Sequence, residues 1–402
     1  MARPHRQRVT RTIQPTLPNP TRTRHGASLQ TATIMNHKWE YKNWNNILKI
    51  YNGKNQKAVE NPDGLYPIYG SGGIMNYADT YICPENCVII GRKGNINNPI
   101  FVPTKFWNVD TAFGLCPGEL LHPRFLFYFC KIYDFERHNK ATTIPSLVKN
   151  DLLKINMPVP PIDIQERIVS ELDKLNELIE IKHSQLKDLD ALAQSLFYET
   201  FGEPFINSKG WPIMNFGDLV SSINYGTSLP AVDGGYYPYI RMNNLTDNGY
   251  LDLSNLKYID IPESELDKCL VRKGDILFNR TNSREKVGKS ALFDRADKMV
   301  IAGYIIRVRA KADMLNPVFA VRYLNLPELK EHLRKICRGA VNQANINSKE
   351  MASIPFIVPP INLQNQFASK IEAIEAQKKR VEASIADLET LLASRMDYWF
   401  ND

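Results

Sequence analysis

The chain has 402 residues, of which 43% are hydrophobic and 23% are charged. These values exclude a largely disordered protein and predict a folded chain of two or three domains. The longest apolar runs fall far short of the roughly 20 residues that cross a bilayer, so we expect no membrane segment and a cytoplasmic protein. Six scattered cysteines in so large a chain argue against a disulfide scaffold and fit a reducing compartment.

The positive charge is concentrated at the N-terminus. Residues 1–34 hold six arginines and no lysine, aspartate or glutamate, whereas the net charge of the whole chain is +7. The remaining chain is therefore almost neutral, and bulk basicity gives no argument for nucleic-acid binding. Residues 1–35 are predicted to be a basic tail that does not pack. The tail resembles a transit peptide, fits a basic arm that touches phosphates, and also fits upstream sequence before a true start at Met35, which we favour.

Residues 36–161 are predicted to form short strands and turns. The apolar runs at 66–69, 87–90 and 99–102 are bounded by glycine or asparagine turns, which is typical of strands. We therefore expect a mixed α/β globule. Its candidate binding residues lie in the polar turns and are Ser71, Arg92, Lys93, Asn95 and Asn97.

A long helix is predicted over residues 162–202. Apolar residues recur there at alternating spacings of three and four, as in the seam of a coiled coil. Prolines end the preceding strand, and Asp163 is well placed as an N-cap. The helical pattern covers about 38 of these residues, which corresponds to roughly 57 Å at about 1.5 Å per residue. The seam consists of Ile168, Leu172, Leu175, Ile179, Lys182, Leu186 and Leu189.

The chain then repeats itself. The motif at 156–165 is echoed at 355–364, an offset of 199 residues, and the surroundings of Trp39 and Trp211 agree at an offset of 172. The second copy of the globule, residues 203–360, is therefore longer than the first and again reads as strands joined by polar turns. Its candidate binding residues are Arg241, Asn243, Asn279, Arg280, Asn282, Arg284 and Lys286.

Residues 361–402 are predicted to form a second long helix. Two equal seams in a duplicated chain pair most simply with each other, and antiparallel pairing would bring Ile179 and Lys182 near Lys378 and Val381. The two lysines then either interrupt the seam and fix its register or reach solvent by their long stems. The second seam keeps the offset of 199 and consists of Phe367, Ile371, Ile374, Lys378, Val381, Ile385 and Leu388.

No sequence motif supports catalysis by this chain. The turn at 68–72 loosely resembles a loop for S-adenosylmethionine, but no Asn/Asp-Pro-Pro-aromatic tetrapeptide follows, and the phosphate-binding Gly-x-x-x-x-Gly-Lys-Ser/Thr motif is absent. The Glu-x-Lys triplets at 180–182 and 328–330 lack a partner acid for Mg²⁺. Cys83 and Cys87 lack a second ligand pair for zinc, so no metal site is predicted.

Binding chemistry is better represented. Arginine and asparagine match the edges of guanine and adenine, whereas lysine, serine and backbone amides suit phosphates. Any single polar loop is about as often a solvated hairpin tip. Both copies, however, place such a cluster between strands, and this repetition favours a binding role.

The chain resembles the DNA-specificity (S) subunits of type I restriction-modification systems, from about Lys38 to Trp399. The resemblance rests on the motifs at 66–73, 89–94 and 273–280 and on the twin Val-Pro-Pro-Ile junctions that lead into helices. It implies two mixed α/β target recognition domains, joined by two long antiparallel coiled-coil helices with a pseudo-twofold repeat. Each domain would read one half of a bipartite double-stranded DNA target. The expected boundaries are a tail at 1–35, recognition domains at 36–161 and 203–360, and helical spacers at 162–202 and 361–402.

The resemblance also implies partners. Two modification (methyltransferase) subunits would dock on the helices, and restriction subunits would supply ATP-dependent translocation and cleavage, in a bacterial or archaeal cytoplasm. The assembled complex is then expected to use S-adenosylmethionine, ATP and Mg²⁺, while this chain binds no cofactor. Two alternatives remain open. One is a duplicated protein–protein scaffold without DNA readout, and the other is a self-contained methyltransferase, against which the missing tetrapeptide argues.

Overall fold

The computed structural model describes residues 39–338 and 344–401, so the predicted tail at 1–35 lies outside the described residues. The chain divides into two compact units. The first unit contains the described residues up to 123 together with 134–162, which we call the first globule. The second unit contains residues 124–133 and 163–399. It therefore includes all but one terminal residue of each long helix, as well as the second globule, residues 203–360.

The first globule contains two main sheets and a separate two-stranded sheet, β1-β9. A four-stranded sheet has the order β2-β8-β5-β6, and a three-stranded sheet has the order β4-β3-β7. All five residues of β5 are buried, which explains why this strand reads as a continuous apolar run. The strands are β1 (Tyr41–Asn43), β2 (Leu48–Asn52), β3 (Tyr66–Gly70), β4 (Gly73–Ala78), β5 (Cys87–Gly91), β6 (Ile100–Val102), β7 (Trp107–Asn108), β8 (Ala112–Pro117) and β9 (Asn156–Pro158), and the short helices are α1 (Trp44–Ile47), η1 (Phe135–His138) and α3 (Lys149–Leu152).

The second globule repeats this topology. Its sheet β11-β19-β15-β17 matches β2-β8-β5-β6, and β13-β12-β18 matches β4-β3-β7, with β14 added at the edge. The central pairs β3–β7 and β12–β18 are both parallel. The predicted mixed α/β fold with an internal repeat is therefore confirmed. The strands are β10 (Ile213–Asn215), β11 (Val220–Tyr225), β12 (Tyr237–Ile240), β13 (Lys257–Ile259), β14 (Leu270–Val271), β15 (Ile276–Asn279), β16 (Thr281–Asn282), β17 (Ser290–Leu292), β18 (Met299–Ile301), β19 (Ile305–Ala310), β20 (Ala344–Asn345) and β21 (Pro355–Ile357).

Short helices complete the second unit. Helix α2 (Pro123–Ile132) and helix α6 (Pro317–Leu324) follow the last strand of the large sheet in their respective copies. Both begin with a proline, whose fixed φ suits the first position of a helix. The other short helices are η2 (Phe216–Leu219), η3 (Met242–Asn244), α5 (Glu263–Cys269), α7 (Pro327–Ile336) and α8 (Ser348–Ala352).

Each globule has a glycine at the same close approach between its two sheets. Gly53 follows β2, and a Cβ there would lie 1.8 Å from the carbonyl oxygen of Val109. Gly226 follows β11, and a Cβ there would lie 2.2 Å from the carbonyl oxygen of Ile301. No side chain fits at such distances from backbone atoms, so the packing of the two sheets requires glycine in both copies.

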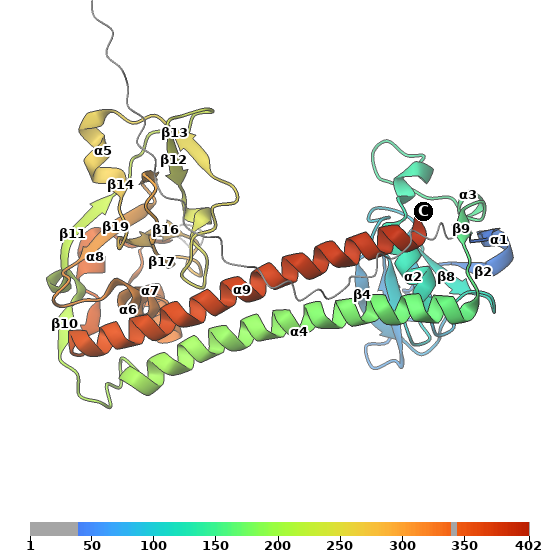
Figure 1. The fold of residues 1–402 in the computed structure, drawn as a ribbon, viewed down its shortest axis with the longest axis horizontal. Helices are drawn as coiled ribbons and strands as arrows, with labels where there is room; N and C mark the ends of the chain where they lie inside the picture. The colour runs from blue at the N-terminus through green and yellow to red at the C-terminus, as the bar shows by residue number, and fades with distance from the viewer. Residues whose placement is uncertain (1–38, 339–343, 402) are drawn as a thin grey trace, which may run out of the picture. The chain divides into compact units, whose positions relative to one another are not determined.

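Two long helices, α4 (Ile162–Phe201) and α9 (Ile361–Phe400), have 40 residues each, or about 60 Å at 1.5 Å per residue. They are antiparallel, because Glu171 near the start of α4 pairs with Arg395 near the end of α9 (Nη2 to Oε2, 3.1 Å). Figure 1 shows the two helices side by side. Helix α4 begins one residue before Asp163, so this predicted N-cap lies in the first turn instead, where its charge still favours the helix dipole. Within residues 39–338 and 344–401, no helix has the length and apolarity needed to cross a membrane.

The register of the helix pair differs from the prediction. The side chain of Lys378 is 8% exposed, and its Nζ lies 2.6 Å from Oδ1 of Asp190. Lys182 is half-buried and donates instead to Gln185 of its own helix (3.3 Å). The two lysines therefore do not meet at the centre of the seam, and that part of the prediction is wrong. Lys378 is the buried polar residue that interrupts the apolar seam, and Lys182 extends along its own helix.

Aromatic packing at one end of the helix pair explains this register. The ring of Phe197 in α4 lies 5.7 Å from Phe319 in α6 and 5.7 Å from Phe367 in α9, and Phe201 lies 5.1 Å from Phe367. These contacts join the second globule and both long helices in one hydrophobic core. Large, fully buried rings contribute more to packing than the aliphatic side chains of the rest of the seam. They therefore set which turns of the two helices lie opposite each other.

One disulfide joins Cys87 in β5 to Cys116 in β8, with 4.5 Å between the Cα atoms. The expectation from cysteine spacing missed this bridge, because the pairing of these two strands is not visible in the sequence. The thiol of Cys83 is buried and donates to Oδ1 of Asn108 (3.4 Å). Burial raises the pKa of Cys83 to about 12, so its metal-binding thiolate form is disfavoured. In the described part of the chain, no three His, Cys, Asp or Glu residues group as metal ligands would.

Candidate nucleic-acid interface

Two arginines occupy the same place in the two globules. Arg92 directly follows β5, and Arg280 directly follows β15, which is the equivalent strand. The backbone N–H of Arg92 donates to the carbonyl oxygen of Thr111 (2.8 Å), and that of Arg280 donates to the carbonyl oxygen of Tyr304 (3.0 Å). The two acceptors precede the equivalent strands β8 and β19. The duplicated topology thus presents one arginine per globule at the same end of an inner strand of the large sheet.

The two guanidinium groups are also anchored in the same way. Nη1 of Arg92 donates to the carbonyl oxygen of Asp110 (3.4 Å), and Nη1 of Arg280 donates to the carbonyl oxygen of Gly303 (3.3 Å). Both arginines are half-buried. A guanidinium has five N–H donors in a fixed fork, so one backbone contact orients the group and leaves donors for a ligand.

Aromatic rings support both groups, although the rings come from different strands. The guanidinium carbon of Arg280 lies 4.7 Å from the ring centre of Tyr225 at the end of β11. That of Arg92 lies 5.7 Å from the ring centre of Phe113 in β8. The hydroxyl of Tyr225 accepts a hydrogen bond from the backbone N–H of Ser348 (2.7 Å), which fixes the ring. Stacking of this kind holds an arginine for planar recognition of a base edge or a phosphate.

The Nε atom of Arg280 is buried and has no hydrogen-bond partner among the described residues. A buried donor without an acceptor costs about 1–3 kcal/mol. Because the atom is buried, a ligand does not reach it in this conformation. The donors that remain for a ligand with oxygen or nitrogen acceptors are therefore those of the two Nη groups.

The remaining candidates of the first copy differ in their surroundings. Lys93 and Asn95 are exposed on the turn after Arg92. Asn97 instead serves the fold, because its Oδ1 accepts from the backbone N–H of Phe135 (2.9 Å). Ser71 is half-buried in the turn between β3 and β4. Lys93 and Asn95 are thus the side chains of this group that are most available to a ligand.

The candidate binding residues of the second copy also differ in how exposed they are. Arg284 and Lys286 are exposed on the loop after β16, whereas Asn282 is half-buried and its Oδ1 accepts from the backbone N–H of Ser283 (2.8 Å). Asn279 is 0% exposed, because it is the last residue of the central strand β15 and its side chain lies inside the globule. In this conformation its amide does not reach a ligand, contrary to the role expected from the sequence.

Arg241 and Asn243 do not lie at the strand end that carries Arg280. Arg241 follows β12, and its Nη2 donates to the carbonyl oxygen of Asn255 (3.0 Å), so it holds the neighbouring loop. Asn243 is exposed on η3.

Sequence reasoning missed the tyrosines of this surface. Tyr225 ends β11, and the exposed Tyr304 precedes β19, the strand that pairs with both β11 and β15. Tyr225 supports the guanidinium of Arg280, and the carbonyl of Tyr304 receives its backbone N–H. Their position becomes apparent only when the strands are aligned, because their separation along the chain hides their proximity.

A duplicated α/β topology, one anchored arginine per copy and a pair of long helices define a duplicated binding protein. A family model described as "Type I restriction modification DNA specificity domain" matches residues 36–191 and 208–390. The chain belongs to this family.

Individual relatives agree with this assignment. The type I restriction enzyme EcoKI specificity subunit of Escherichia coli (strain K12) is 22% identical over 335 residues, which cover 76% of this chain and 70% of that protein. The MjaVIII specificity subunit of Methanocaldococcus jannaschii is 22% identical, with coverage of 84% and 86%. The crystal structure of the S subunit from M. genitalium superposes with a TM-score of 0.55 at 15% identity, over 92% of this chain and 98% of that chain. The structural likeness supports the fold.

Proposed function

We propose that this chain is the DNA-specificity subunit of a type I restriction-modification complex and has no catalytic role of its own. Each globule reads one half of a bipartite double-stranded target. The observation that carries the proposal is the equivalence of Arg92 and Arg280, because two copies of one surface present the same base-matching group with the same anchoring contacts. Membership in the specificity-domain family supports DNA as the ligand. It also disfavours the scaffold alternative.

The long helices provide a surface for protein partners. Three exposed apolar residues of α4 lie within about 60° of one another on the helix surface, given about 100° per residue. Exposed apolar side chains gathered on one face commonly mark a site of protein association. We assign this face to the docking of modification (methyltransferase) subunits. The three residues are Leu178, Ile181 and Leu192.

The cofactors of the reaction belong to the partners under this proposal. The modification subunits use S-adenosylmethionine, and the restriction subunits use ATP and Mg²⁺. The specificity subunit contributes recognition and geometry.

The binding surface is tested by substitutions that separate base contacts from phosphate contacts. Arg280→Ala in the complex with modification subunits is expected to reduce discrimination at one base pair of one half-site by about 1–3 kcal/mol. Arg92→Ala is expected to act in the same way on the other half-site. The measurement is the affinity of each complex for duplexes that carry every single-base variant of the target.

Lys286→Ala serves as the matched comparison, because an exposed lysine that contacts phosphate should weaken binding to all sequences alike. Equal losses across all base variants for Arg280→Ala would refute its base-reading role. If the wild-type complex binds all duplexes equally well, the scaffold alternative holds instead.

A further inference from the structure

The two globules differ most in one connection. Sixteen residues join β3 to β5 in the first copy, whereas 35 residues join the equivalent strands β12 and β15 in the second. One loop of the longer connection, residues 246–251, reaches the long helices, and we call it the strap. The strap is closed by hydrogen bonds from the N–H of Thr246 to the carbonyl of Tyr250 (2.9 Å) and from the N–H of Tyr250 to Oγ1 of Thr246 (3.0 Å). It therefore has a defined shape.

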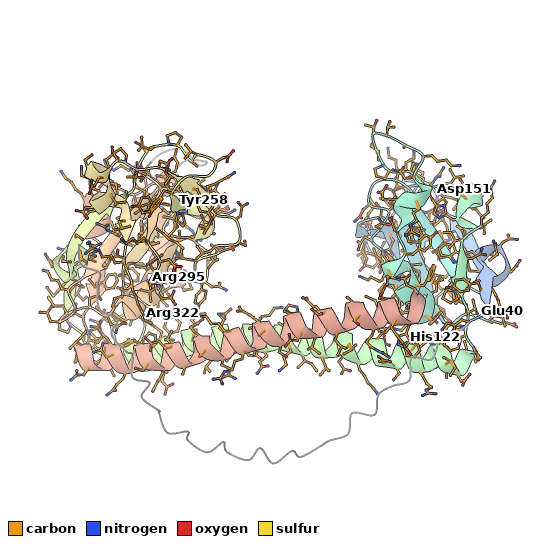
Figure 2. The ribbon with its side chains drawn as sticks, turned by 45° about the horizontal axis from the view of Figure 1, so that its top comes forward. Glu40, His122, Asp151, Tyr258, Arg295 and Arg322 are labelled. Carbon is orange, nitrogen blue, oxygen red and sulfur yellow. A yellow bond between two sulfur atoms is a disulfide. The ribbon has the colours of Figure 1, made fainter. Side chains whose placement is uncertain are left out.

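Tyr250 joins the strap to helix α9. Its hydroxyl donates a hydrogen bond to Oε1 of Glu375 in α9 and accepts one from Nη2 of Arg322 in α6. Arg322 and Glu375 also pair directly at 2.8 Å. Burial raises the pKa of Tyr250, so the hydroxyl keeps its proton and can donate. In Figure 2, Arg322 is labelled where the second globule meets the helix pair.

A second set of contacts joins the strap to the other long helix. The ammonium group of Lys378 in α9 lies 4.5 Å from the ring centre of Tyr250 and 2.6 Å from Oδ1 of Asp190 in α4. Nδ2 of Asn248 in the strap donates to Oδ2 of the same Asp190 (3.3 Å). All these residues belong to the second unit. The strap thus connects the second globule to both helices by directional, partly buried contacts.

The first copy has a contact between its short helix and its long helix but has no strap. Tyr128 is the sixth residue of α2, as Arg322 is of α6, and Asn176 is the fifteenth residue of α4, as Glu375 is of α9. Nδ2 of Asn176 donates to the hydroxyl of Tyr128 (3.1 Å), which matches the pair formed by Arg322 and Glu375. The Tyr128 hydroxyl also donates to Asp173 of α4, and Arg124 of α2 pairs with the same carboxylate (2.8 Å). A contact between the short helix and the long helix is therefore common to both copies, and the second copy adds Tyr250 to it.

We propose that the strap fixes the orientation of the second globule on the helix pair and so makes the complex selective for the spacing between the two half-sites. This inference rests on the proposed function. One additional base pair moves a half-site by about 3.4 Å and rotates it by about 34–36°. A globule held by several directional contacts resists such a displacement, and the loss of a contact lowers that resistance. Tyr250 is a positioning residue, because it acts through the orientation of the reading surface.

The test compares methylation by the complete modification complex on duplexes with the natural spacer and with one base pair more or fewer. Tyr250→Phe removes the hydroxyl and keeps the ring beside Lys378. It is expected to reduce the preference for the natural spacer about tenfold, which corresponds to about 1.4 kcal/mol. Tyr250→Ala is expected to reduce it further. Methylation of the natural site should stay near that of the wild type, because the half-site contacts are unchanged.

Tyr258→Phe is the matched control, since it removes a hydroxyl from an exposed tyrosine of β13 in the same globule (Figure 2). It should keep the wild-type preference for spacing. Glu375→Gln is a second variant that keeps the shape of the side chain and should act like Tyr250→Phe. Unchanged spacer preference in Tyr250→Ala, with sequence-selective methylation retained, would overturn the inference. A wild-type complex without sequence selectivity would instead refute the proposed function, and the strap inference with it.

Discussion

Replacing Phe197 with alanine is expected to lower the free energy of unfolding by about 3–5 kcal/mol. The ring is 1% exposed and contacts Phe201, Phe319, Tyr323 and Phe367. Its removal leaves a cavity where α4, α6 and α9 meet, and the surrounding rings cannot all move into the space. Urea denaturation of the full chain measures the change.

Leu391→Ala provides the comparison on a long helix. This side chain of α9 is 46% exposed, so its truncation should change the free energy of unfolding by no more than about 0.5 kcal/mol. Similar losses for the two variants would show that the aromatic cluster is not the principal anchor of the helix pair.

A methyl group added at Gly53 should lower the free energy of unfolding nearly as much as the loss of the Phe197 ring. The added Cβ would lie 1.8 Å from the carbonyl oxygen of Val109 and 2.7 Å from that of Asn108, so the two sheets of the first globule would have to separate. We expect Gly53→Ala to lower the free energy of unfolding by about 3 kcal/mol, at the upper end of overpacking costs, because backbone atoms and not a flexible side chain are in the way. Gly226→Ala should have the same effect in the second copy. Thermal or urea unfolding measures both.

Gly72→Ala is the control for these glycines. No atom lies within 4 Å of a Cβ at Gly72, and its φ is not in the left-handed region. The stability of the Gly72→Ala variant should therefore stay close to that of the wild type. A stable Gly53→Ala protein would contradict the close approach of the two sheets.

The long helices and the duplication were predictable because their signals are local. The three-four spacing that contains Ile168 and Phe367 is read within a few turns, and the repeated Val-Pro-Pro-Ile junction marks the start of each helix. The register was not predictable, because Phe319 of α6 takes part in setting it and lies outside both seams. The disulfide was missed for a similar reason, since Cys87 and Cys116 become neighbours only when β5 and β8 pair.

The candidate site was partly predictable. Arg92 and Arg280 follow apolar strands and were recognised as loop residues, and their equivalence follows from the repeated topology. Their supporting rings, Phe113 and Tyr225, were not predicted, because each lies on another strand. The sequence pattern predicts that Asn279 is a loop residue because it directly precedes Arg280, although it is still part of β15. Sequence patterns thus locate the polar turn but do not show where the buried strand ends.

The central claim is that each globule reads one half of a split DNA target. The most direct measurement is a genome-wide map of methylated bases in cells that contain the wild-type chain, no chain, Arg92→Ala or Arg280→Ala. We predict that a split motif loses its methylation without the chain, and that each substitution reduces selectivity in one half of the motif only. An unchanged methylation map without the chain, or a loss of selectivity in both halves from either substitution, would contradict this account.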